Sequence, residues 1–212
     1  MKRTNKLKRI QTAIDYTLRT DAVQKGLNKV GMSKAEIIQG RGLLEHVQML
    51  DAAQQKEYGE RYQATDELNQ ARQQAKTLYK KHIEVARFAL KEQRGYWKTL
   101  ELSGARKDDL FGWLAQAHTF YSNVYQVKET LAQYNLPEAE LQQGESMIDA
   151  VIEAYNVRQK EDNEAQAATQ LRNEALDKLE VWMRRFTQAA RLAFVDDMQT
   201  LKGLGLVSKV NA

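Results

Sequence analysis

The sequence predicts an all-α protein, a tandem duplication of two similar three-helix units that form a bundle of six helices. Three observations support this prediction. The 212 residues include one proline and 11 glycines, and the chain is rich in strong helix formers such as Ala, Leu, Gln and Glu. The chain aligns with itself at a shift of 104 residues. Its apolar residues recur at spacings of three and four, as on one face of a helix.

The internal repeat is the strongest of these observations. Residues 34–92 align with residues 138–196 without a gap, and 16 of the 59 aligned pairs are identical. Two unrelated segments of this helix-rich composition would share several times fewer identical pairs by chance. A repeat of this length predicts that the same supersecondary unit occurs twice in the fold.

The repeat divides the chain into four expected segments. These are a basic N-terminal tail at 1–9, a first unit at 10–104, a second unit at 105–202 and a flexible C-terminal tail at 203–212. The two units either pack side by side about a pseudo-twofold axis or extend end to end, and the sequence leaves both arrangements open.

The first helix of each unit is expected over about residues 8–30 and 108–134. Gly31 and Asn135 occupy the same place in the alignment, directly after these helices. Glycine and asparagine enter the left-handed backbone region most readily, and many helices end in that conformation. We therefore predict a helix-ending turn at both residues.

The second helix is expected over about residues 34–58 and 137–162. In the first copy, Ser33 and Glu36 have the spacing of a capping box, which favours a helix start. In the second copy, Pro137 suits the first turn of a helix because its φ is already helical.

The third helix is expected over about residues 64–102 and 166–202. Gly59 aligns with Asn163 between the second and third helices, and this pair predicts a turn there. The alternative is one continuous helix of about 60 residues in each unit, because helix propensity is high throughout this region.

A turn at this joint has a testable consequence. It folds the third helix back on the second, so that Glu36 lies opposite Arg87 and Glu140 lies opposite Arg191. We predict that both pairs lie within ion-pairing distance. In one straight helix, Glu36 and Arg87 would instead be about 75 Å apart, at 1.5 Å per residue.

A glycine recurs within the second helix of each unit. The phrases AEIIQG and AELQQG end in Gly40 and Gly144, which lie on the apolar face. A glycine inside a helix costs about 1 kcal/mol relative to alanine. Its presence in both copies therefore predicts that another helix comes close at each glycine.

The repeated polar residues have two interpretations. A carboxylate beside a guanidinium can bind a polar ligand or orient a catalytic water, so each copy could form a pocket. Such residues also form structural ion pairs that fix helix register. We favour the structural interpretation because no nucleophile or second acid accompanies them. The residues are Glu36, Gln39 and Arg87 in the first copy, and Glu140, Gln143 and Arg191 in the second.

The histidines do not form a metal-binding pattern. None of His46, His82 and His118 stands three residues after a glutamate, the spacing used by di-iron helical bundles. Their counterparts in the other copy are apolar, which is typical of structural positions. We expect no metal ion and no cofactor.

Charge and composition restrict the partners. The net charge is +4, but five of the first nine residues are Lys or Arg, so residues 10–212 carry −1. The basic tail offers a route to nucleic acid, yet no basic helix face accompanies it, and we do not expect that partner. There is no cysteine, no apolar signal segment and no apolar run of about 18 residues. We expect a cytoplasmic protein without a membrane partner.

We expect a non-catalytic helical module that binds a protein partner or self-associates, because long apolar faces at heptad-like spacing suit helical partners. The alternative is a ligand-binding or enzymatic bundle with a polar pocket around the repeated Glu, Gln and Arg residues.

Overall fold

The computed structural model describes residues 3–207, and their regular secondary structure is entirely helical, as predicted. The chain divides into two compact units. Unit 1 combines the residues up to Tyr58 with those from Glu164 onward, and unit 2 is the segment Gly59–Asn163. These units do not coincide with the expected segments 10–104 and 105–202, because each contains residues from both halves of the sequence.

Two long helices run through both units. They are α3 (Lys34–Ala89) and α7 (Glu138–Ala193), each of 56 residues. The predicted turn at Gly59 and Asn163 is therefore wrong, and the alternative of one continuous helix is correct. Both residues are exposed on the helix surface, where the cost of about 1 kcal/mol for a glycine is too small to break a helix of strong formers. Among residues 3–207, no helix combines the length and apolar character needed to cross a membrane.

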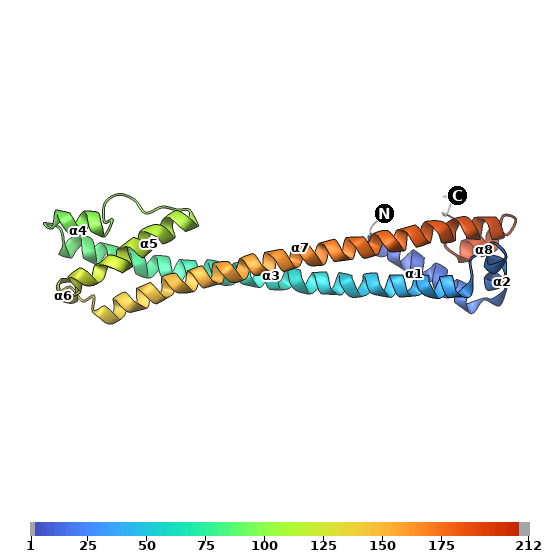
Figure 1. Cartoon of the computed structure of the whole chain (residues 1–212), viewed down its shortest axis with the longest axis horizontal. Helices are drawn as coiled ribbons and strands as arrows, with labels where there is room; N and C mark the ends of the chain where they lie inside the picture. The colour runs from blue at the N-terminus through green and yellow to red at the C-terminus, as the bar shows by residue number, and fades with distance from the viewer. Residues whose placement is uncertain (1–2, 208–212) are drawn as a thin grey trace. The chain divides into compact units, whose positions relative to one another are not determined.

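Unit 1 contains three shorter helices beside its parts of α3 and α7 (Figure 1). They are α1 (Arg3–Arg19), α2 (Asp21–Lys29) and α8 (Met198–Gly203). The expected single helix at 8–30 is broken, because Thr20 has an extended backbone with φ −121°. The core of unit 1 joins all five helices, and its largest side chains are Ile10, Ile14, Leu27, Met32, Ile37, Trp182 and Phe186.

Unit 2 has four shorter elements beside its parts of the long helices (Figure 1). They are α4 (Arg94–Thr99), α5 (Leu110–Val124), the 3-10 helix η1 (Tyr125–Val127) and α6 (Lys128–Ala132). The expected helix at 108–134 is thus also divided. The core of unit 2 is rich in aromatic rings, among them Tyr79, Trp113, Phe120 and Tyr121.

The chain after each long helix differs from the prediction. The expected third helix does not continue to residue 102 or 202; α3 and α7 end, the chain turns, and α4 and α8 follow as separate short helices. The expected flexible tail begins at Gly203, which ends α8, and the next residue, Leu204, is buried in the core of unit 1. The expected basic tail is helical from Arg3 onward. Residues 1–2 and 208–212 of the two expected tails lie outside the described residues.

The turns before the long helices have left-handed residues. Gly31 has φ +81° and Asn135 has φ +59°. Next to them, the Met32 N–H donates to the Leu27 carbonyl at 3.0 Å, and Leu136 N–H donates to the Leu131 carbonyl at 3.1 Å. These six-to-one bonds are those of a Schellman ending. Both turns therefore close one helix and aim the chain into the next.

The two long helices begin differently. At α3, the Ser33 N–H donates to Glu36 Oε2 at 2.8 Å, and the Glu36 N–H donates to Ser33 Oγ at 3.3 Å. These reciprocal bonds form a capping box. At α7, Pro137 precedes the first helical residue and accepts a backbone hydrogen bond from Glu140 at 3.0 Å. Side chains therefore pair with N–H groups at the start of α3, whereas a backbone carbonyl does so at the start of α7.

Candidate functional site

The predicted pairing of Glu36 with Arg87 is wrong, because both residues belong to one continuous helix and are 51 residues apart. Glu36 Oε1 lies 2.6 Å from Arg185 Nη2, within unit 1. Arg87 donates from Nε to the Leu102 carbonyl and from Nη2 to the Gly104 carbonyl, each at 2.7 Å. Glu36 therefore links two long helices, and Arg87 holds the loop after α4.

The predicted pairing of Glu140 with Arg191 is wrong for the same reason, since both lie on α7. Glu140 Oε2 instead lies 2.9 Å from Lys81 Nζ, within unit 2. This hydrogen bond lowers the pKa of Glu140. The pKa of Glu36 is also lowered, first by the Ser33 backbone N–H and then by Arg185. Both carboxylates are therefore charged partners in structural contacts.

The other two repeated polar residues, Gln39 and Gln143, are exposed. Neither makes a side-chain hydrogen bond with the described residues 3–207. The six residues thus do not converge on one pocket in either unit. We assign no ligand or catalytic role to this set.

Gly40 is buried beneath the ring of Trp182 from α7. A Cβ at Gly40 would overlap three atoms of that ring. Trp182 Nε1 donates to the Glu36 carbonyl at 2.9 Å, and the Trp182 ring stacks on Phe186 at 5.2 Å between centroids. Gly40 therefore leaves room for the Trp182 indole, which is held by its hydrogen bond to Glu36 and by its stacking on Phe186.

Gly144 lies beneath Tyr121 from α5 in unit 2. A Cβ there would overlap the Tyr121 hydroxyl and two of its ring carbons. At both Gly40 and Gly144, the close neighbour is thus an aromatic side chain rather than the backbone of another helix. The hydroxyl also shares a hydrogen bond of 3.0 Å with His82 Nδ1.

His82 is the histidine that the core encloses, while His46 and His118 are exposed. Burial lowers the pKa of His82 to about 4, although Glu140, whose Oε2 is 3.7 Å from Nε2, acts in the opposite direction. Burial also raises the pKa of Tyr121. Both groups are neutral at physiological pH. We interpret the pair as structural.

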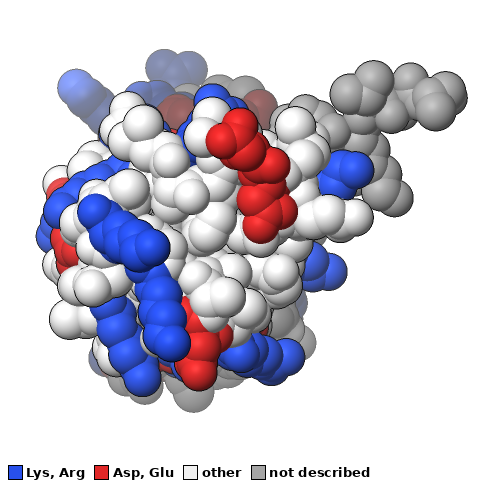
Figure 2. All heavy atoms as spheres, turned by 90° about the vertical axis from the view of Figure 1, so that its right-hand side faces the viewer, with Lys and Arg blue, Asp and Glu red and all other residues white. Residues whose placement is uncertain are grey.

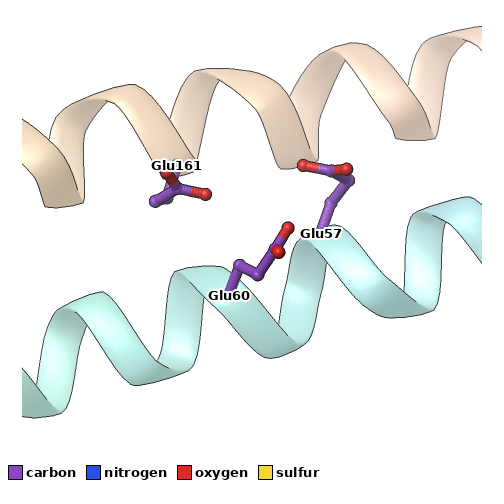
Figure 3. A group of neighbouring side chains, drawn as sticks. All are labelled: Glu57, Glu60 and Glu161. Atoms are coloured by element: carbon purple, nitrogen blue, oxygen red, sulfur yellow. The ribbon is translucent and has the colours of Figure 1, made fainter.

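Two glutamates face each other across the long helices of unit 2. Figure 3 shows Glu60 on α3 and Glu161 on α7, with Glu57 one turn before Glu60 on the same helix. Carboxylate oxygens of Glu60 and Glu161 approach within 4.8 Å. Glu161 Oε1 also lies 3.3 Å from Lys160 Nζ, so its charge is partly balanced. A cluster of acids alone does not identify a metal site, and we assign none.

A cavity of about 760 Å³ opens to solvent beside α4 in unit 2. It is lined by Lys91, Arg94, Trp97, Lys98, Glu101, Ser103 and Gln116. Sequence reasoning placed most of these residues on a long third helix, where basic residues indicate only a solvated face. The cavity exists because α3 ends before residue 91 and the chain turns back, and no local sequence signal revealed that turn.

Exposed apolar side chains form a second kind of surface. In unit 1 we define patch 1 as Leu192, Val195 and Met198, around the turn from α7 to α8; Leu192 and Val195 are each 72% exposed. Figure 2 views the end of unit 1 that carries α2 and α8, and much of this face is uncharged, with Lys and Arg side chains gathered on its left and lower parts.

In unit 2 we define patch 2 as Phe88 and Tyr134, which are both exposed. Their rings meet edge to face with centroids 5.6 Å apart. Phe88 stands 104 residues before Leu192, at the end of the other long helix. Unit 1 thus exposes apolar side chains at the end of α7, and unit 2 exposes them at the end of α3.

Comparisons of the chain with models of protein families, with curated proteins and with solved structures found no match. The functional interpretation therefore rests on the cavity and the two patches.

Proposed function

We propose that the chain is a tandem duplication whose two copies fold by exchanging their third helices. The identical residues at an interval of 104 support this proposal, and so do backbone hydrogen bonds that recur at the same interval. The Leu102 N–H donates to the Trp97 carbonyl, and the Leu206 N–H donates to the Leu201 carbonyl, at 2.9 and 3.0 Å. The left-handed residues Gly31 and Asn135 follow the same interval.

Under this proposal each unit is a composite. Unit 1 takes its α1, α2 and the first part of α3 from the first copy, and the last part of α7 with α8 from the second. Unit 2 takes the complementary elements. A single copy would therefore leave its apolar faces uncovered, which explains why the copies are joined in one chain.

We infer that the protein is a non-catalytic module that self-associates. The observation that carries this inference is the exposure of large apolar side chains in both patches, at corresponding ends of α7 and α3. Exposed apolar clusters on a protein surface mark interaction sites, because water leaves them favourably when a partner covers them.

The partner that we propose is a second copy of this chain, with patch 1 of one copy against patch 2 of the other. Net charge favours this arrangement over contact between two identical patches. Unit 1 has 18 Lys and Arg against 12 Asp and Glu, whereas unit 2 has 14 against 16. Units of opposite net charge attract, and two copies of unit 1 repel.

Sedimentation velocity on the full chain tests this proposal. Protein concentrations from about 1 to 200 μM cover dissociation constants in the micromolar range. We expect association that increases with concentration and weakens in high salt, where charges are screened. The variant Leu192→Glu/Val195→Glu places two charges in patch 1, and Phe88→Glu places one charge in patch 2, so that each variant disrupts one apolar patch. The control Leu171→Glu/Val181→Glu adds the same charge at exposed positions of α7 outside patch 1.

A mixture of the two patch variants gives the sharpest result. Neither variant should associate alone, but together they should form a dimer, because each retains the patch that the other lacks. The control should associate like the unmodified chain. A chain that stays monomeric throughout, or a patch 1 variant that associates normally, would show that the proposal is wrong.

A further inference from the structure

We propose that the cavity beside α4 binds a ring-bearing phosphate ester of nucleotide size. Its volume of about 760 Å³ lies within the range of small-molecule sites. Four features of the cavity support this ligand class: its charge, its fixed rim, its aromatic wall and its contrast with the corresponding place in unit 1.

The cavity wall has an excess of positive charge. Lys91, Arg94 and Lys98 outnumber the single acid, Glu101. Among residues 3–207, the side chains of Arg94 and Lys98 have neither an ion-pair nor a hydrogen-bond partner. Two cations without protein partners at one concave surface provide the charge that a diphosphate requires, and the Arg94 guanidinium can hold two phosphate oxygens at once.

The rim of the cavity is fixed by arginines. Arg106 Nη2 donates to the carbonyls of Glu101 and Ser103 at 2.7 and 2.8 Å. Arg87 donates to two further carbonyls of the same loop, those of Leu102 and Gly104. A loop held in this way loses little conformational entropy when a ligand binds, and this increases affinity.

Trp97 forms the aromatic part of the wall. Its Nε1 donates to the Leu90 carbonyl at 2.8 Å, which fixes the indole, and the side chain is half-buried. A fixed and partly exposed ring offers a stacking surface for the planar part of a ligand. The Gln116 Oε1 accepts a bond from the Lys107 N–H at 2.9 Å, which orients the amide beside the cavity.

Unit 1 lacks two of these three cations at the corresponding place. Residues 104 positions after Lys91 and Arg94 are Val195 and Met198, which are exposed and apolar. The fold at the end of a long helix therefore does not require positive charge. Lys91 and Arg94 are therefore a specific feature of unit 2, whereas Lys98 has Lys202 as its counterpart. The two additional cations favour a ligand over general solubility as their role.

Calorimetric titration of the full chain with adenosine diphosphate, pyrophosphate and adenosine tests the proposal. We expect ADP to bind, pyrophosphate to bind more weakly and adenosine to bind most weakly. Arg94→Ala/Lys98→Ala should weaken ADP binding by at least about tenfold, the effect of losing one charged contact. Trp97→Leu should weaken binding of ADP but not of pyrophosphate.

Lys202→Ala is the matched control, because Lys202 stands at the position of Lys98 in unit 1. It should leave ADP binding unchanged. Circular dichroism confirms that each variant remains helical. The proposal is overturned if about 5 mM ADP gives no binding heat, which means affinity below the millimolar range. It is also overturned if Arg94→Ala/Lys98→Ala binds ADP normally, or if pyrophosphate binds as tightly as ADP.

Discussion

Units 1 and 2 both place an aromatic ring on a helix glycine, but they take the ring from different helices. In unit 1 the Trp182 indole of α7 covers Gly40, and in unit 2 the Tyr121 ring of α5 covers Gly144. The glycine is common to both units, whereas the side chain that fills the space differs. In both units the backbone arrangement therefore requires a residue without a side chain at this position, and either a tryptophan or a tyrosine ring can fill the space above it.

The neighbour of each ring differs in chemistry. Phe186 stacks on Trp182, while His82, at the corresponding position in the repeat, shares a hydrogen bond with Tyr121. Unit 1 thus has an apolar contact where unit 2 has a buried titratable group. This single difference predicts that acid destabilises the two units unequally.

The largest expected effect concerns His82. In the unfolded chain its pKa is about 6.5, and in the folded protein it is about 4. As pH falls from 6.5 to 4, the unfolded chain takes up a proton that the folded protein does not. Stability is therefore full above pH 6.5 and falls through this range, by up to about 3 kcal/mol. Urea denaturation followed by circular dichroism between pH 7 and 4 measures the loss.

His82→Phe makes unit 2 like unit 1 and isolates this effect. The carboxylates of Glu36, Glu140 and Asp197 also have lowered pKa values, so every variant loses stability in acid as they protonate. The difference between the unmodified chain and His82→Phe removes the contributions of Glu36 and Asp197, and that of Glu140 apart from the part that His82 itself causes. Parallel pH profiles of the two proteins would contradict the prediction.

The next effect concerns Gly40. Gly40→Ala puts a methyl group into the space of the Trp182 ring, which is buried and hydrogen-bonded and cannot move freely. We expect a loss of about 2 kcal/mol from this overpacking. Gly42→Ala is the matched control, because a Cβ there meets nothing within 4 Å. The control should gain up to about 1 kcal/mol through higher helix propensity.

Gly144→Ala extends this prediction to unit 2. The Tyr121 hydroxyl would have to shift, and its bond to His82 would be strained. The denaturant midpoints of Gly40→Ala, Gly42→Ala and Gly144→Ala rank the three sites by the effect of the added methyl group on stability. If all three gained stability, neither glycine would be needed for close packing.

The sequence was sufficient to predict features that depend on neighbouring residues. The all-helical class follows from composition, and the capping box of Ser33 and Glu36 involves groups three residues apart. The path of the long helices could not be predicted in this way. Near the expected turn, Arg61 Nε lies 2.7 Å from Asp162 Oδ1, so α3 packs on α7 there. Such long-range contacts stabilise a continuous helix over a turn, and local propensity does not contain them.

The polar contacts were harder to predict for the same reason. Glu36 and Glu140 were singled out because they recur, but their partners are Arg185 and Lys81, in the other half of the chain. Only the antiparallel register of α3 and α7 brings these residues together. The cavity was missed because the helix end before Lys91 has no glycine or proline to mark it.

A smaller effect concerns the start of α3. Ser33→Ala removes the side chain that accepts from the Glu36 N–H, and we expect a loss of about 1 kcal/mol. Thr20→Ala is the control, because Thr20 precedes α2 without making a side-chain cap bond. It should change stability by less than about 0.5 kcal/mol. Thermal denaturation of both variants measures the difference, and equal losses would rule out a specific role for the cap.

The smallest effect concerns the corresponding ion pairs. Lys81→Ala and Arg185→Ala each remove a partly exposed partner of a glutamate, and we expect losses of at most about 0.5 kcal/mol at pH 7. Added salt should reduce both losses.

The two ion pairs should nevertheless differ in acid. The Lys81 charge lowers the pKa of His82, so Lys81→Ala raises that pKa from about 4 towards its ordinary value. A folded-state pKa nearer 6.5 leaves a smaller difference from the unfolded chain, and less stability is lost between pH 6.5 and 4. Arg185 has Phe186 beside it in the chain instead of a histidine, so Arg185→Ala should change the pH profile only through Glu36, whose lowered pKa it helps to maintain, and should keep the stability loss that depends on His82. Identical profiles for the two variants would mean that the Lys81–Glu140 pair does not influence His82.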